Sequence, residues 1–365
     1  MSKKKDRVFY EKVSPFLKEK MQMLKKQKGE DSEEYQALFL QYKTTNLENI
    51  ESPEKNLRHY QADLNFESQQ NILKGLERLY CPSLVIETTT ICAAHCRYCL
   101  RKNYEISTLD EDDLINIAKY CGSFPVRTEL SEVLITGGDP LIIPRRLSFL
   151  IEALIEYAPN IKIIRIATRL PQQSPEKIDN NVYEIFKKYK SEIRFEIATQ
   201  VNHPIELFPE VINKFNELLN HGVKIYSQNV LLKNVNDNIE TLASLYNKMR
   251  ELNFEAHYLF HCVPIIGIHH LRTSVEKGIK LAKHLTNSGK ISGRVKPMYA
   301  AMTDVGKVTF YEGVILERNK SNEILLQTSY RYEERLKWNP NWKLPQTAEV
   351  DKNGFLRVWY LDGED

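Results

Sequence analysis

The sequence lacks any long apolar run: no stretch approaches the roughly 20 apolar residues that a membrane-spanning helix needs. Charge of one sign is not in excess, since 51 Lys and Arg stand against 48 Asp and Glu, with a formal net charge of +3. So small a charge says little about partners and gives no reason to expect a nucleic acid or an anionic membrane surface. No apolar segment of signal-peptide length follows the Lys-rich start, so we expect a cytoplasmic protein.

Cysteine is also scarce. The chain has six: Cys81, Cys92, Cys96, Cys99, Cys121 and Cys262. Three of them fall within eight residues and the others are scattered. In a long chain without a secretion signal, this distribution favours a metal site over a disulfide framework.

From about residue 83, short β-branched runs alternate with helix-period segments. The runs are SLVIETT, EVLITGG, IKIIRIATR, IRFEIATQ, KIYSQNVLL and EAHYLFHCV, which start at residues 83, 132, 161, 193, 224 and 255. Successive βα units require right-handed parallel crossovers, and near-continuous apolar strands fit a sheet buried on both faces. We therefore predict an α/β fold, a partial (βα)6 barrel of the TIM type. Its chemistry should lie at the carboxyl ends of the strands.

The flanking segments have a different character. Residues 1–80 are strongly charged and helix-like, which predicts an N-terminal helical extension before a barrel domain of residues 81–292. Residues 293–365 lose the βα alternation and carry hairpin-like runs such as KVTFYEGVILE, which predicts a C-terminal α+β tail.

A cysteine cluster directly follows the first predicted strand. Cys92, Cys96 and Cys99 have the spacing C-x3-C-x2-C. Three thiolates can ligate three irons of a [4Fe–4S] cluster and leave the fourth iron open, as catalytic metal sites do. S-adenosylmethionine (SAM) could bind that iron and be cleaved reductively to a 5′-deoxyadenosyl radical. The alternatives are a zinc site with His95 as fourth ligand, although His95 adjoins Cys96, or unrelated buried cysteines.

Four further residues are candidates for SAM binding near this cluster. Tyr98 would lie beside the adenine, or is merely a loop aromatic. Gly137, Gly138 and Asp139 end the second strand, where two glycines expose backbone groups and a carboxylate can accept hydrogen bonds from the methionyl ammonium. A glycine pair alone is weak evidence, but it is specific about forty residues after such a cysteine motif.

Three polar residues at other strand ends extend this set. Arg169 ends the third strand and could pair with a carboxylate, Gln228 lies on the fifth, and His203 comes just after the fourth. Each has an ordinary alternative: a surface ion pair for Arg169, a barrel hydrogen bond for Gln228 and a loop cap for His203.

With these motifs, the sequence resembles lysine 2,3-aminomutase and its relatives, radical SAM enzymes. The matching segments are GLERLY, CAAHCRYCLRK, EVLITGGDPL, RIATRLP, FEIATQVNHP, SQNVLLKNVND, GIHHLRT and FYEGVI. The resemblance implies that Arg101 binds the substrate carboxylate; the alternative is an exposed loop cation. It also implies an electron donor such as flavodoxin or ferredoxin, and a homodimer.

The resemblance fails where the family binds pyridoxal phosphate (PLP). The glycine-rich loop is absent, and Lys307 aligns with the strand beyond that loop rather than with the Schiff-base lysine. Ser83 stands where an arginine helps to hold the PLP phosphate, and Val263 and Met302 stand where two acids hold the distal ammonium of lysine. A buried ammonium facing Val and Met would lack a partner. We therefore expect no lysine 2,3-aminomutase activity and no PLP, with Lys296 or Lys307 as the alternative imine lysine.

The leading prediction is an enzyme whose adenosyl radical abstracts hydrogen from a small, amino-acid-like substrate. If the outcome is epimerisation, Cys262 at the end of the sixth strand is placed to donate a hydrogen atom; otherwise it is a core thiol. Two rivals remain: a PLP-dependent aminomutase with a displaced lysine, and a protein that binds SAM and the cluster without turnover.

Overall fold

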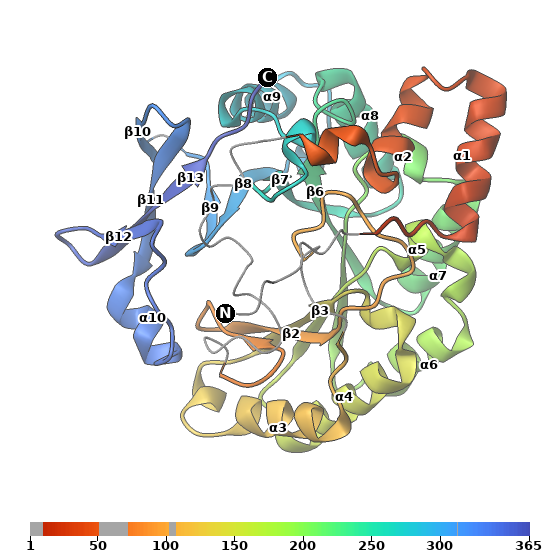
Figure 1. Ribbon diagram of the computed structural model, residues 1–365. Helices are drawn as coiled ribbons and strands as arrows, with labels where there is room; N and C mark the ends of the chain where they lie inside the picture. Colours follow the sequence, from red (N-terminus) through yellow and green to blue (C-terminus); the bar gives the residue numbers. More distant parts are fainter. Residues whose placement is uncertain (1–9, 51–71, 102–106, 312) are drawn as a thin grey trace.

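The computed structural model describes residues 10–50, 72–101, 107–311 and 313–365. Its centre is a curled sheet in the order β1-β2-β3-β4-β5-β6-β7-β8-β9 (Figure 1). Strands β2 to β8 are parallel, whereas β1 and β9 run antiparallel at the two edges. The strands are β1 (Leu76–Glu77), β2 (Ser83–Thr89), β3 (Glu132–Gly137), β4 (Ile163–Ala167), β5 (Arg194–Thr199), β6 (Lys224–Leu231), β7 (Glu255–His261), β8 (Met298–Thr303) and β9 (Gly306–Thr309).

The predicted partial barrel is confirmed, because the six runs form β2 to β7. The parallel sheet continues through one more strand, β8, which lies beyond residue 292. The hairpin expected in KVTFYEGVILE is wrong: its first half is β9, paired with β8, and its second half begins β10 (Ile315–Arg318) in another sheet. The domain boundaries at residues 80 and 292 stay predictions.

Amphipathic helices cover the outside of the sheet. They are α3 (Glu111–Gly122), α4 (Pro144–Tyr157), α5 (Leu170–Gln173), α6 (Asn180–Tyr189), α7 (Pro209–Asn220), α8 (Ile239–Glu251) and α9 (Val275–Asn287). Helix α3 is typical: Asp110 and Asp113 form a capping box at its start, and its apolar face buries Leu114 and Ile117. The main apolar core lies between these helices and the outer face of the sheet. The inner face of the curled sheet is therefore available to line a site.

The N-terminal extension packs beside the carboxyl ends of β5 and β6. It contains α1 (Pro15–Lys28) and α2 (Glu33–Tyr42), each with a serine N-cap. Helix α2 contacts the turn after β5, and the Thr241 hydroxyl on α8 donates to Glu33 at 2.7 Å. Residues 1–9 and 51–71 of the predicted extension lie outside the described residues. No helix in the described part of the chain is long and apolar enough to cross a membrane.

The C-terminal segment forms a second, antiparallel sheet in the order β10-β11-β13-β12. Its other elements are β11 (Glu323–Arg331), α10 (Tyr332–Trp338), β12 (Ala348–Val350) and β13 (Phe355–Leu361). This segment contacts both edges of the curled sheet. On the β9 side, Arg335 Nη2 donates to the Val305 carbonyl at 2.7 Å; on the β1 side, the Tyr330 ring lies 6.1 Å from that of Tyr80. The predicted α+β tail thus spans the open side of the partial barrel (Figure 1).

Candidate functional site

A cavity of about 1090 Å³ lies at the carboxyl ends of the barrel strands. It brings together most of the residues that the sequence analysis selected. These are Cys92, Cys96, Tyr98, Cys99, Arg101, Gly137, Gly138, Asp139, Arg169 and Gln228. His203 and Cys262 are not among the residues that line it. Strand ends in a parallel sheet meet at one edge, which explains why residues so distant in sequence converge.

The cysteine loop is fastened to the barrel and to the N-terminal extension. The Asp139 amide donates to the Ile91 carbonyl at 2.8 Å, and the Arg97 amide donates to the Gln41 carbonyl at 2.8 Å. None of the six cysteines forms a disulfide. Burial raises the pKa of the Cys92 thiol well above its usual range, and neighbouring Cys99, Asp139 and Cys96 raise it further.

These thiols fit the predicted cluster. They are half-buried, face one cavity and sense one another electrostatically. A metal that binds thiolates displaces their protons, so iron would relieve the repulsion that opposes ionisation of Cys92. Among the described residues, no three His, Cys, Asp or Glu side chains come close enough to share a single metal ion.

His95 has a partner outside the cysteine cluster. Its Nδ1 lies 3.0 Å from the Tyr10 carbonyl oxygen, and its ring packs edge-on against the Tyr10 ring at 4.7 Å. This placement gives His95 a structural role in joining the cysteine loop to the N-terminal extension. It lends no support to the alternative of a zinc site.

The two glycines allow the cysteine loop to approach the end of β3. A Cβ on Gly137 would lie 2.0 Å from the Thr89 carbonyl oxygen, and one on Gly138 would lie 2.2 Å from the Ile91 carbonyl oxygen. Gly137 also has φ +125°, where a side chain would be strained. Both positions therefore require glycine for packing, whatever their backbone groups do for SAM.

Asp139 is engaged by the neighbouring strand end. Its carboxylate accepts hydrogen bonds from the Thr168 hydroxyl at 2.8 and 2.9 Å, and from the amides of Arg169 at 2.9 Å and Leu141 at 3.1 Å. Burial raises the pKa of this carboxyl to about 6. In the structure Asp139 joins β3 to β4; its predicted contact with the SAM ammonium stays a prediction.

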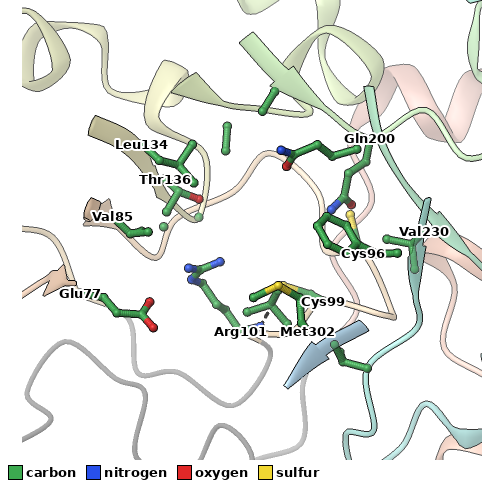
Figure 2. A pocket seen from close by; sticks show the side chains of 18 of the residues that line it. Glu77, Val85, Cys96, Cys99, Arg101, Leu134, Thr136, Gln200, Val230 and Met302 are labelled. Atoms are coloured by element: carbon green, nitrogen blue, oxygen red, sulfur yellow. Dashed lines mark hydrogen bonds between the residues drawn. The ribbon is translucent and has the colours of Figure 1, made fainter. Parts of the chain in front are cut away.

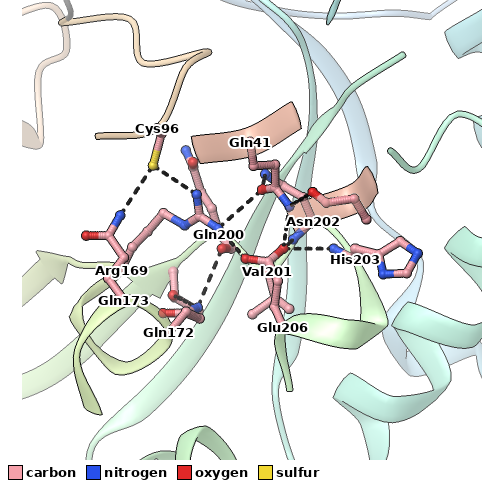
Figure 3. A network of polar contacts seen from close by, with 12 residues as sticks. Gln41, Cys96, Arg169, Gln172, Gln173, Gln200, Val201, Asn202, His203 and Glu206 are labelled. Carbon is pink, nitrogen blue, oxygen red and sulfur yellow. Dashed lines mark hydrogen bonds and ion pairs between the residues drawn. The ribbon is translucent and has the colours of Figure 1, made fainter. Parts of the chain in front are cut away.

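Arg169 lies at the centre of a polar network that reaches the cysteine cluster (Figure 3). Its Nη1 donates to Cys96 Sγ at 2.9 Å, and Gln173 Nε2 donates to the same sulfur at 3.4 Å. The other end of the guanidinium pairs with buried Glu206. Donors to a ligating sulfur tune an iron–sulfur cluster, so this network would hold Cys96 and adjust its electronic properties.

The network includes residues that the sequence analysis missed. Gln41 on α2 contacts Arg169, Tyr98 and Glu206, and Glu206 also accepts the Asn202 amide at 2.7 Å. Nothing local marks these residues as functional, because they come from distant segments. The polar sequence LPQQSP directly after Arg169 signals only Gln173, the second donor to Cys96.

Tyr98 is buried beside this network. Its hydroxyl accepts a hydrogen bond from Asn202 Nδ2 at 2.7 Å, and its ring packs with Val230 and Val263 in an apolar cluster. Because the ring also lines the cavity, it is positioned as an apolar wall. Its predicted contact with adenine stays a prediction.

His203 and Cys262 have structural contacts outside the cavity lining. His203 caps the short helix that follows it, since its Nδ1 accepts the Ile205 amide at 3.1 Å, and its Nε2 lies 3.5 Å from Glu33. Cys262 is fully buried in the apolar cluster that contains Val263. The structure favours the loop-cap and core-thiol alternatives; SAM binding by His203 and hydrogen donation by Cys262 remain untested predictions.

Several charged and polar residues lie inside the barrel near the cysteine loop. Arg101 Nε donates to Glu87 at 2.5 Å, and Arg165 pairs with Glu196 at 2.7 Å. Gln228 Nε2 lies 3.3 Å from His257 Nδ1. Lys307 also lines the cavity, and burial together with Arg165 lowers the pKa of its ammonium.

Comparison with known proteins gives the chain a family. The family model described as the radical SAM superfamily matches residues 86–277. A putative L-lysine 2,3-aminomutase from Aquifex aeolicus is 32% identical over 299 residues, covering 80% of this chain and 73% of the relative. The L-lysine 2,3-aminomutase of Clostridium subterminale is 27% identical over 261 residues, covering 71% of this chain and 62% of the relative.

Among solved structures, a radical SAM methyltransferase from Sphaerobacter thermophilus aligns with a TM-score of 0.44 and 15% identity, over 61% of this chain and 67% of that one. Likeness at this level informs neither the site nor the substrate. The family model, by contrast, extends from within β2 to the start of α9 and includes the whole cysteine loop. The chain therefore belongs to the radical SAM superfamily and, within it, to the lysine 2,3-aminomutase-like family.

Proposed function

We propose that this chain is a radical SAM enzyme that abstracts hydrogen from a small, amino-acid-like substrate without PLP. Cys92, Cys96 and Cys99 would hold a [4Fe–4S] cluster with SAM on its open iron. With an external electron donor, this pair would supply a 5′-deoxyadenosyl radical. The observation that carries the proposal is the convergence of three cysteine thiols, none in a disulfide, and Arg101 on one cavity.

The chain's own residues would bind the substrate and shield the chemistry. Arg101 offers a cation to a carboxylate beside Cys99, which keeps the substrate close to the cluster. Tyr98, Val230 and Val263 supply apolar wall, which limits access of water to the reacting atoms.

The substrate named for the relatives, L-lysine, suits this cavity poorly. The positions predicted to hold the distal ammonium carry Val263 and Met302, and both line the cavity. A desolvated ammonium without a counter-charge or hydrogen-bond acceptor there would be costly. A different amino-acid-like molecule therefore fits better.

The test begins with anaerobic reconstitution of the protein with iron and sulfide. We expect about four irons per chain, and release of 5′-deoxyadenosine when SAM and dithionite are added. Cys96→Ala should lose both properties. Cys81→Ala is the matched control, because Cys81 is also half-buried but does not line the cavity. Stoichiometric zinc in place of iron, or a cluster that never cleaves SAM, would overturn the proposal; the second result would leave a non-catalytic SAM- and cluster-binding protein.

Lys307 supports a second candidate, a PLP-dependent aminomutase with a displaced lysine. Its ammonium lies 5.2 Å from the ring centres of both Tyr80 and Tyr258, and a lowered pKa favours the neutral amine that an imine needs. PLP should then give imine absorbance that borohydride traps on the peptide containing Lys307. Lys307→Arg should abolish trapping. Wild-type protein that cleaves SAM but traps no PLP would exclude this candidate.

A further inference from the structure

Glu77 projects a carboxylate into the cavity. It is paired with Val85 across the β1–β2 ladder, so the two residues share a face of the sheet, and both line the cavity. Figure 2 shows the Glu77 carboxylate facing the Arg101 guanidinium across open space, with Cys99 and Met302 beyond Arg101. Leu76, the other residue of β1, is fully buried in the core behind it.

No hydrogen bond or ion pair reaches the Glu77 carboxylate within the part of the chain that the structure describes. Glu87, two residues beyond Val85 on β2, is different: it pairs with Arg101 Nε at 2.5 Å. Two glutamates thus lie near Arg101: Glu87 pairs with it, whereas Glu77, which lines the cavity, has no such partner among the described residues.

The surroundings of Glu77 favour a cation bound next to its carboxylate. Burial raises the pKa of the Glu77 carboxyl, and the negative charge of Glu87 raises it further, although Arg101, Arg335 and Lys307 lower it. These cations act only from a distance, because Arg335 Nη2 is bonded to the Val305 carbonyl and Lys307 lies over the Tyr80 and Tyr258 rings. A cationic ligand group beside Glu77 would supply at close range the charge that the described residues supply only from a distance.

We propose that Glu77 binds the ammonium group of the substrate while Arg101 binds its carboxylate. The inference rests on the proposed function and narrows it: the substrate is a zwitterionic amino acid whose ammonium stays free. A guanidinium carries five N–H donors, so pairing with Glu87 through Nε is compatible with binding a carboxylate as well. An amino group held by Glu77 is not the nitrogen of a PLP imine, so the inference also opposes the second candidate.

The experiment uses reconstituted wild-type protein with SAM bound and without reductant. The probes are the twenty common L-amino acids, and binding is measured by calorimetry. For each one that binds, the matched probe is the same carboxylic acid with hydrogen in place of the ammonium. We expect removal of the ammonium to weaken binding to wild-type protein roughly 10- to 100-fold, as for loss of a hydrogen bond to a charged group.

Glu77→Gln should weaken binding of the amino acid by a similar factor and make the two probes bind alike, because the ammonium has then lost its partner. Glu77→Asp should recover part of the affinity. Glu251→Gln removes the same charge from the exposed end of α8 and should change nothing. With reductant, the Glu77→Gln defect should appear mainly in KM for the amino acid rather than in kcat.

Equal affinity for the two probes in wild-type protein, unchanged affinity in Glu77→Gln, or no binding of any amino acid would overturn the inference. Failure of the proposed function looks different. In that case the protein binds an amino acid through Glu77 but releases no 5′-deoxyadenosine when it is reduced.

Discussion

Gly138→Ala tests whether the close packing of the cysteine loop on β3 is what positions the cluster ligands. The new Cβ would lie 2.2 Å from the Ile91 carbonyl oxygen and 2.5 Å from the Thr90 carbonyl carbon. Both are backbone atoms, so no side-chain rotation can relieve the contact. The separation must grow to at least 3.0 Å, and the loop must retreat because β3 is held between β2 and β4.

Displacement of the cysteine loop should lower the free energy of unfolding in two ways. Overpacking of this kind destabilises proteins by about 1–3 kcal/mol. Loss of the bond from the Asp139 amide to the Ile91 carbonyl, 2.8 Å long, adds about 1 kcal/mol. We therefore expect the free energy of unfolding of the apoprotein to fall by about 2–4 kcal/mol in urea titrations. Because Cys92 directly follows Ile91, iron content after reconstitution and 5′-deoxyadenosine release should fall as well.

Gly293→Ala is the control for introducing a methyl group. A Cβ there meets no atom within 4 Å and the residue is exposed, so stability should change by less than about 0.5 kcal/mol. If Gly138→Ala kept the iron content, SAM cleavage and unfolding curve of wild-type protein, the loop could not be held by this contact.

Three other changes test the surroundings of the cavity. Glu206→Gln leaves the buried Arg169 guanidinium without its carboxylate and should cost about 3–5 kcal/mol in urea unfolding; wild-type stability would contradict the assigned ion pair. Arg272→Met removes donors to the carbonyls of Cys262, Leu361 and Asp362, so the C-terminal segment should be cleaved faster in limited proteolysis. Burial, with Arg272, lowers the pKa of His261 to about 4. His261 is thus neutral when folded, and stability should be full above about pH 6.5 and fall by roughly 3 kcal/mol as the pH drops towards 4. His261→Gln should flatten this part of the pH profile, and an unaltered profile would refute the assignment.

The barrel was predictable where each strand carries its own signal. Strands β2 to β7 carry β-branched, Leu or aromatic residues and are separated by helices of clear period, so local patterns sufficed. Strand β8, Met298–Thr303, reads MYAAMT and lacks β-branched residues until its end. It is a strand because Tyr258 to Phe260 on β7 pair with it, and such non-local pairing leaves no trace in the local sequence.

The residues of the candidate site also fall into those that local sequence patterns reveal and those that they do not. The cysteine motif and the glycine pair were found because their members are neighbours in sequence and follow strands. Gln41 and Glu206 escaped because an ordinary helix and a short turn deliver them from more than a hundred residues apart. His203 was selected for its position after a strand, but its imidazole satisfies the turn itself, which only its hydrogen bonds reveal.

The least predictable part of the chain also closes the site. A partial barrel leaves an open side, and an adenosyl radical needs protection from solvent. Here the C-terminal segment spans that side and contributes Asn339, Trp342 and Leu344 to the cavity lining. Glu77 lies on β1 and Lys307 lies on β9, the two edges of the sheet that this segment contacts. Apart from Arg101 on the cysteine loop, the residues that we expect to select the substrate belong to the edges and the closing wall, where contacts between distant segments bring the elements together.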